Sequence, residues 1–78
     1  MEEEFNKAAD LVKTKILDKE GLLTVYGLYK QATMGDNCSG RPSIFDPRGR
    51  AKWDAWESRK GMSQEDAMKS YVDFVSSL

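Results

Sequence analysis

The chain has no histidine, a single cysteine and only two prolines among its 78 residues. Without histidine or a second cysteine, neither a zinc site nor a histidine-based catalytic triad has the side chains that it needs. Cys38 has no partner for an internal disulfide, so we interpret it as a free thiol in a polar loop of a protein from a reducing compartment. The sequence thus predicts no metal site and no catalytic residues.

Long hydrophobic runs are also missing. No stretch approaches the roughly 20 apolar residues that cross a bilayer as a helix. The N-terminus opens with Met1 and three glutamates and has no apolar run behind it, so we expect no secretory signal peptide in the chain as given. We therefore expect a cytoplasmic protein that does not insert stably into membranes and makes at most transient contact with them.

A strong charge of one sign is absent as well, because the formal net charge is −1. The charges are nevertheless uneven, since residues 41–52 contain Arg41, Arg48, Arg50 and Lys52 against Asp46 alone. This local excess is too small for a nucleic-acid-binding surface, which needs a strongly basic domain. Two interpretations of it stay open, a solvated face and one half of an anion site.

What is present is the composition of one small globular domain. Hydrophobic residues make up 40% of the chain and charged residues 32%, which is ordinary for such a domain. A chain of this length buries only about 60% of its unfolded surface, so it has room for one modest core. We expect residues 1–78 to form a single domain and the protein to be a monomer.

The apolar pattern predicts four helices and no strands. Apolar residues recur at offsets of three and four in residues 3–17, 18–34 and 48–60 and again after residue 63, which is the spacing of one helix face. Asp18 and Ser63 suit the N-caps of the second and fourth helices, and Pro47 suits the first turn of the third. Residues 34–47, with glycine and proline, are expected to form a long loop. The fold class is therefore all-α, a small four-helix bundle.

Two expected helix faces carry most of the apolar residues. The first contains Phe5, Ala8, Ala9, Val12 and Ile16, and the second contains Leu22, Val25, Tyr26 and Tyr29. Both sets are spaced for one face of a helix, so both are expected to contribute to the core.

The most informative segment is Tyr26-Gly-Leu-Tyr29-Lys30. Tyr26, Tyr29 and Lys30 lie three and four residues apart, so they share one helix face. Aromatic faces stack on nucleic-acid bases, and a lysine ammonium is a compact charge for phosphate oxygens. The patch therefore suits a ligand with a flat ring and a phosphate. The alternative is that both tyrosines belong to the core and place only their hydroxyls at its rim.

The rest of the chain resembles the acyl-CoA-binding protein family in five blocks that occur in the family's order and cover nearly all residues. The blocks are Phe5-x-x-Ala8-Ala9-x-x-Val12-Lys13, Tyr26-x-x-Tyr29-Lys30-Gln31-Ala32-Thr33-x-Gly35-Asp36, Arg41-Pro42, Ala51-Lys52-Trp53-Asp54-Ala55-Trp56 and Gly61-x-Ser63-x-Glu65-Asp66-Ala67-Met68-x-x-Tyr71. The Lys-Trp-Asp-Ala-Trp run is the most specific of them. The chain departs from the family pattern between the first two helices, where the connection is shorter and lacks the usual Lys-Pro.

The resemblance implies a function and a set of binding residues. The family binds long-chain fatty acyl-CoA esters non-covalently, one per monomer, and acts as an intracellular carrier and buffer of the acyl-CoA pool, without catalysis and without a cofactor. The positions that match the family's ligand-binding residues are Tyr26, Tyr29, Lys30, Lys52, Tyr71, Phe5, Ala9 and Lys13. Among these, the resemblance directs Lys30, Lys52 and the Tyr26 hydroxyl at the 3′-phosphate of the nucleotide.

A second class of function is also open. Trp53, Trp56 and Phe74 are large apolar side chains that would form a hydrophobic patch if they were exposed together, as in a small helical protein–protein interaction module. In that case the tyrosines and lysines need not converge. The positions of these two sets of side chains therefore separate the two readings.

Overall fold

The structure is a computed structural model that describes residues 1–78. It contains four helices, α1 (Glu2–Val12), α2 (Lys19–Met34), α3 (Pro47–Glu57) and α4 (Gln64–Ser76), and no strands. The predicted all-α, four-helix architecture is confirmed. None of the four helices combines the length and the apolar composition needed to cross a membrane.

Side-chain caps fix where three of the helices begin. The carboxylate of Asp18 accepts a hydrogen bond from the Gly21 N–H at the start of α2, and the Ser63 hydroxyl accepts one from the Asp66 N–H at the start of α4. Both N-caps were predicted. Asp46 caps α3 in the same way, with Pro47 in the first turn, where its missing N–H costs no hydrogen bond.

Two helices end earlier than the sequence pattern suggested. The first was expected to continue to residue 17, but α1 ends at Val12, and the Thr14 hydroxyl donates a hydrogen bond to the Leu11 carbonyl at 2.7 Å. Ile16 is fully exposed and is not part of the apolar stripe. The physical reason is local, because threonine bonds to nearby backbone groups in competition with the helix ladder.

The third helix was expected to continue to residue 60, whereas α3 ends at Glu57. Residues 58–61 form a tight turn instead, in which Gly61 has a φ of 92°. Glycine adopts this left-handed conformation without steric cost. The turn sends the chain directly to the start of α4.

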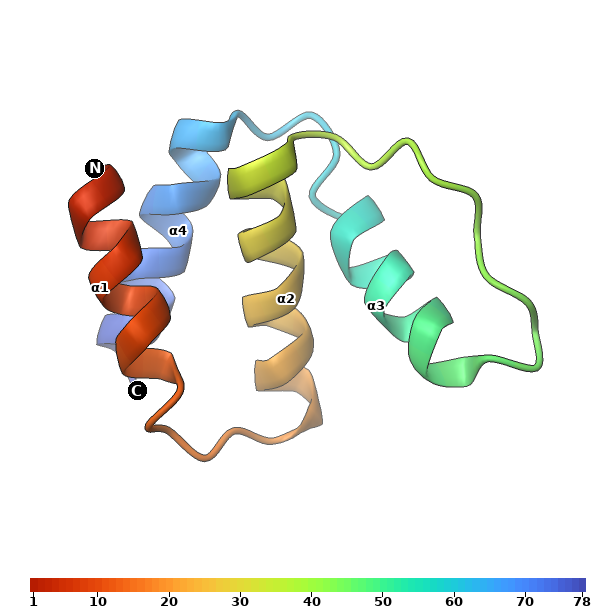
Figure 1. Cartoon of the computed structure of the whole chain (residues 1–78), viewed down its shortest axis with the longest axis horizontal. Coiled ribbons are helices and arrows are strands. Elements are labelled where there is room, and N and C mark those ends of the chain that lie inside the picture. Colours follow the sequence, from red (N-terminus) through yellow and green to blue (C-terminus); the bar gives the residue numbers. More distant parts are fainter.

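The helices are arranged so that α4 and α2 form the centre of the molecule. In Figure 1, α1 packs on α4, α2 packs on α4 beside it, and α3 lies on the far side of α2. α1 and α4 run in one direction, and α2 and α3 run in the opposite direction. The long loop 35–46 spans the length of α3, which lets two consecutive helices run parallel.

The core is formed by three helices. Its buried members come from α1, α2 and α4, and they are Phe5, Ala8, Leu28, Ala32, Ala67, Tyr71 and Val75. Leu28 and Ala32 form the buried face of α2, whereas Leu22 and Tyr29 of the predicted core face are largely exposed. The side of α2 that carries Leu22, Tyr26 and Tyr29 is therefore available to a ligand.

Candidate functional site

The side chains predicted to bind a ligand meet across the contact between α2 and α3. The ammonium of Lys52 on α3 lies 5.0 Å from the centre of the Tyr26 ring on α2. One turn further along both helices, the ammonium of Lys30 lies 4.8 Å from the centre of the Trp56 ring. Each helix thus supplies one cation and one aromatic ring, in register, because the two helices run parallel.

Close approach of the two helices makes this register possible. A Cβ atom on Gly27 would lie 2.4 Å from the carbonyl oxygen of Ala55, so only glycine fits at this position of α2. Gly27 lies one residue after Tyr26, and Ala55 lies between Lys52 and Trp56. The glycine therefore sets the distance across which Tyr26 meets Lys52.

Three further site residues form an aromatic cluster from three helices. The rings of Phe5 and Tyr29 are stacked with centres 5.6 Å apart, Phe5 and Tyr71 are 4.9 Å apart, and Tyr29 and Tyr71 are 6.0 Å apart. Tyr29 is 42% exposed, but Phe5 and Tyr71 are only 4% and 2% exposed. Tyr29 is therefore the ring that faces solvent, and the other two support it from the core.

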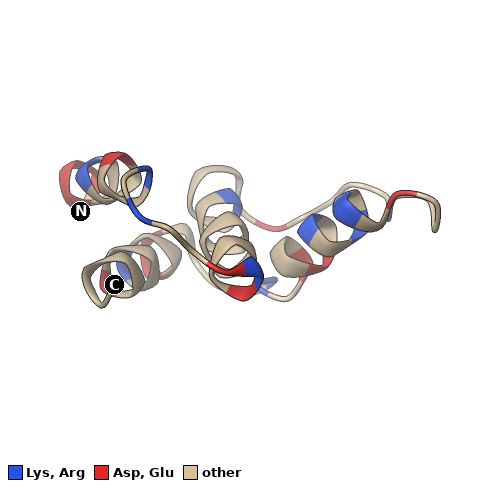
Figure 2. Cartoon of the chain, turned by 90° about the horizontal axis from the view of Figure 1, so that it is seen from below, with Lys and Arg blue, Asp and Glu red and all other residues tan.

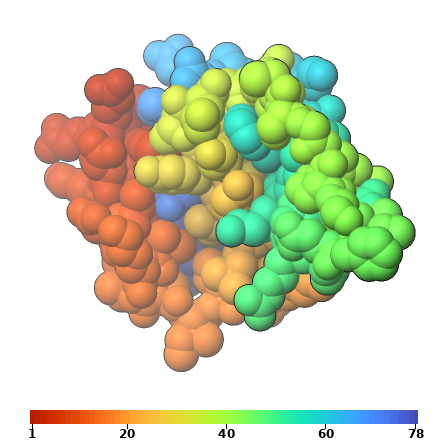
Figure 3. Space-filling view, turned by 45° about the vertical axis from the view of Figure 1, so that its right-hand side comes forward, coloured from red at the N-terminus to blue at the C-terminus, as the bar shows by residue number.

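Burial affects the chemistry of Tyr71. Removal from water, with a smaller contribution from nearby Tyr29, raises the pKa of the Tyr71 phenol above its usual value, because both effects disfavour the phenolate. Tyr71 is thus a neutral, packed ring at neutral pH. Figure 3 shows atoms of α4 between those of α1 and α2, at the floor of this face of the molecule.

An apolar groove leads away from Tyr26 and Lys52 between the first halves of α2 and α3. Its volume is about 820 Å³. The residues that line it come from both helices and are Lys19, Leu22, Leu23, Tyr26, Pro47, Arg48, Ala51 and Lys52. Tyr26 and Lys52 therefore belong both to the groove and to the row of cations and rings.

A smaller and more polar hollow lies on the other side of Leu23 and Ala51. It has a volume of about 480 Å³ and contains Glu20, Asp54 and Arg59 among its lining residues. Two carboxylates make it a poor place for an anionic ligand. The charge and the lining of the two hollows thus distinguish the larger one as the candidate site for an anion with an apolar chain.

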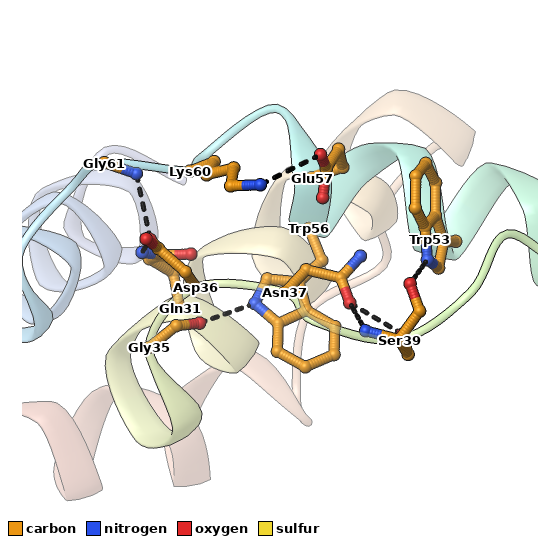
Figure 4. Close-up of polar contacts among 10 residues, drawn as sticks. All are labelled: Gln31, Gly35, Asp36, Asn37, Ser39, Trp53, Trp56, Glu57, Lys60 and Gly61. Carbon is orange, nitrogen blue, oxygen red and sulfur yellow. Dashed lines mark hydrogen bonds and ion pairs between the residues drawn. The ribbon is translucent and has the colours of Figure 1, made fainter.

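The sequence did not predict the polar network that holds α2 to the turn before α4. The Gln31 side chain is fully buried and its Nε2 donates hydrogen bonds to Asp36 at 2.8 Å and to the Met62 carbonyl at 2.7 Å. Asp36 also accepts a hydrogen bond from the Gly61 N–H at 2.9 Å (Figure 4). These bonds, foremost the one from Gly61, lower the pKa of the Asp36 carboxyl because they stabilise its charged form.

The two tryptophans hold the long loop on α3. The indole N–H of Trp56 donates to the Gly35 carbonyl at 2.8 Å, and that of Trp53 donates to the Ser39 carbonyl at 2.9 Å (Figure 4). Trp56 is buried, and both Trp53 and Phe74 are half-buried. These side chains do not form an exposed apolar patch, so nothing here favours the protein-interaction module.

The remaining two predicted site residues lie on or next to α1, the helix that packs on α4. Ala9 is half-buried against the core, and Lys13 is exposed with its ammonium 3.8 Å from Asp10. Leu22, Leu23, Pro47 and Ala51 line the groove although sequence reasoning did not single them out as ligand contacts. For Leu22 and Leu23 the available signal was their position four and three residues before Tyr26, on the same side of one helix.

The fold and site define a small four-helix domain with a groove for an anionic, partly apolar ligand. Residues 2–75 match the family model described as acyl CoA binding protein. The chain belongs to this family. It is 53% identical over 76 residues to acyl-CoA-binding protein 2 of Saccharomyces pastorianus, covering 97% of this chain and 86% of that protein.

Two further comparisons agree. The acyl-CoA-binding protein homolog of Drosophila melanogaster is 45% identical over 78 residues, covering 97% of this chain and 91% of that protein. The crystal structure of Oryza sativa acyl-CoA-binding protein 2 superimposes with a TM-score of 0.95 at 46% identity, covering 99% of this chain and 88% of that one. The predicted family and fold are both confirmed.

Proposed function

We propose that this protein binds long-chain fatty acyl-CoA esters non-covalently, one per chain, and acts as an intracellular carrier and buffer of the acyl-CoA pool. In this proposal residues 1–78 work as a single domain and a monomer, in the cytoplasm, without a cofactor and without catalysing a reaction. Membership in the acyl-CoA-binding protein family supports the ligand class.

One observation carries the proposal. Tyr26 and Lys52 pair at 5.0 Å and also line the apolar groove of about 820 Å³. An acyl-CoA has an anionic nucleotide joined to a long apolar chain, so it needs a cationic and aromatic site that continues into an apolar one. The Tyr26–Lys52 pair is the junction between two such sites.

The side chains at the nucleotide end have distinct proposed roles. Lys30, Lys52 and the Tyr26 hydroxyl bind the 3′-phosphate, since ammonium groups and hydroxyls donate to phosphate oxygens. The exposed ring of Tyr29 stacks on the adenine, as aromatic rings do on bases. Phe5 and Tyr71 hold Tyr29 in position from the core.

At the other end, the acyl chain lies in the groove against Leu22, Leu23 and Ala51. Each methylene removed from water contributes up to about 0.8 kcal/mol, so affinity rises with chain length until the groove is filled. None of the groove residues comes from the shortened connection between the first two helices. Ala9 and Lys13 complete the proposed set of ligand-contacting residues on the α1 side.

Native mass spectrometry tests the proposal. We expect one palmitoyl-CoA per chain, much weaker binding of free CoA, and weaker binding still of palmitate, which lacks every group that the cations address. Equal binding of palmitate and palmitoyl-CoA would contradict the proposal. Binding of several esters to one chain would also contradict it.

A further inference from the structure

Two large apolar side chains stand at the corner of an exposed turn in the long loop. The Asp46 N–H donates a hydrogen bond to the Ser43 carbonyl at 2.9 Å, which closes a turn with Ile44 and Phe45 at its centre. The Phe45 N–H also donates to the Ser43 hydroxyl at 3.1 Å. Ile44 is 72% exposed and Phe45 is 88% exposed. Turn centres are usually occupied by glycine, proline or small polar residues, so this pair is unexpected.

The turn is held in place from both sides. Asp46, its last residue, caps α3 through its carboxylate. On the other side, Arg41 bonds to Asp54 of α3 at 3.0 Å, and Trp53 bonds to Ser39. Ile44 and Phe45 are therefore presented by a fixed backbone, and their insertion into an apolar medium costs little additional ordering of the loop.

Cations without an acidic partner lie next to the turn. Arg48, Arg50 and Lys52 on the first half of α3 make no ion pair, whereas Arg41 is paired with Asp54. Figure 2 shows Lys and Arg along this part of α3 and the loop projecting beyond it at the end of the molecule. The Asp46 carboxylate, the one acidic side chain nearby in the sequence, faces the α3 backbone as its cap.

An apolar tip beside unpaired cations matches the two layers of an anionic membrane surface. Phenylalanine and isoleucine enter the boundary between head groups and acyl chains, while arginine and lysine meet the anionic head groups. A protein partner is a poorer match, because a specific protein interface covers about 800 Å² on each side, and two side chains supply only a small part of that.

We propose that the Ile44–Phe45 turn, together with Arg48 and Arg50, docks this protein reversibly on anionic lipid bilayers. Pro47 and Arg48, which follow the turn directly, also line the α2–α3 groove, so docking places this part of the groove near the lipid surface. The docking does not depend on the proposed ligand and is measured without it.

Vesicle flotation tests the docking with the full chain and no acyl-CoA. We expect binding to vesicles of phosphatidylcholine with about 30% phosphatidylserine, and at least tenfold weaker binding to phosphatidylcholine alone, since each cation near an anionic surface contributes roughly fivefold. Added salt should weaken the binding by screening. No binding to the anionic vesicles would overturn the proposal, as expected if the turn docks on a protein instead.

Matched variants locate the contact. Replacement of both tip residues, Ile44→Ser with Phe45→Ser, should reduce binding to the anionic vesicles roughly tenfold or more, because the apolar insertion is lost. Leu11→Ser is the control, since Leu11 is also exposed but lies on α1 at the other side of the molecule. The assignment would be overturned if Leu11→Ser lost as much vesicle binding as the tip variant, or if the tip variant lost none.

The charge contribution is tested at Arg50, which does not line the groove. Arg50→Gln should weaken vesicle binding roughly fivefold, and Lys69→Gln on α4 should leave it unchanged. Calorimetry of the tip variant with dodecanoyl-CoA, without lipid, should give the wild-type affinity. The two proposals are thus tested separately. Vesicle binding tests the docking, and calorimetry with dodecanoyl-CoA tests the proposed function.

Discussion

Gly27 on α2 faces the backbone carbonyl of Ala55 on α3 so closely that a Cβ atom at residue 27 would lie 2.4 Å from the carbonyl oxygen. Gly27→Ala should therefore push α3 away from α2. Alanine favours a helix over glycine by about 1 kcal/mol, but overpacking against a fixed backbone costs about 1 to 3 kcal/mol. We expect a net loss of stability in denaturant titration and weaker binding of acyl-CoA.

The control for this variant is Gly40→Ala, because nothing lies within 4 Å of a Cβ at that position. It should leave the free energy of unfolding within about 0.5 kcal/mol of the wild type. Gly27→Ala with unchanged stability and unchanged ligand affinity would show that the α2–α3 distance does not matter to the site.

Lys30 should contribute to binding through the 3′-phosphate. Lys30→Ala should weaken palmitoyl-CoA binding tenfold or more in calorimetry, since hydrogen bonds to charged groups contribute about 1.5 to 3 kcal/mol. The salt dependence of binding should also become flatter. With the ester of dephospho-CoA, which lacks the 3′-phosphate, the substitution should have little effect. An equal loss with both ligands would rule out this role, and Lys69→Ala provides the control for removal of an exposed lysine.

Tyr29 and Tyr71 should respond differently to truncation, although their rings are only 6.0 Å apart. Tyr29 is 42% exposed, so Tyr29→Ala should weaken ligand binding by about 1 to 3 kcal/mol, the effect of one lost stacking surface. Tyr71 is 2% exposed, so Tyr71→Ala should destabilise the fold by about 3 to 5 kcal/mol through the cavity that it leaves.

Two measurements separate these effects, thermal unfolding without ligand and calorimetry with it. Tyr71→Phe, which keeps the ring, should retain most of the stability. If Tyr29→Ala destabilised the fold as much as Tyr71→Ala, the division between an exposed ring and its supports would be wrong.

Asp36 should make stability depend on acidity. Its pKa in the folded protein is lowered from 3.8 by the hydrogen bonds from Gly61 and Gln31. A carboxyl with a lowered folded pKa stabilises the fold above its unfolded pKa, and this contribution disappears as the pH falls through the folded pKa. The difference in melting temperature, wild type minus Asp36→Asn, should thus be larger at about pH 6 than at about pH 2.5. A difference that is the same at both values would contradict the assignment.

The sequence predicted the number and order of the helices because caps and apolar spacing are local signals. Asp18 and Ser63 act where they were expected to act. The end of α1 was predicted wrongly, because Ile16 continued the apolar spacing although the chain had already turned at Thr14. A spacing pattern cannot show that the last apolar residue has no neighbour to pack against.

The candidate site was predictable as a set of residues but not as a geometry. Tyr26, Tyr29 and Leu22 were placed together on one face, yet the buried face of α2 is the one with Leu28, Gln31 and Ala32. The distinction depends on where α4 packs, which is a long-range property. The contact of Gly27 with Ala55 is of the same kind, because it joins residues that are far apart in the chain.

The measurement that tests the account most directly is NMR of the protein bound to palmitoyl-CoA with a ¹³C-labelled acyl chain. We predict nuclear Overhauser contacts from the acyl methylenes to the methyl groups of Leu22, Leu23 and Ala51, and from the adenine protons to the Tyr29 ring. Acyl contacts to Thr24, Ala55 and Arg59 in the smaller hollow, with none to Leu22, would contradict the account.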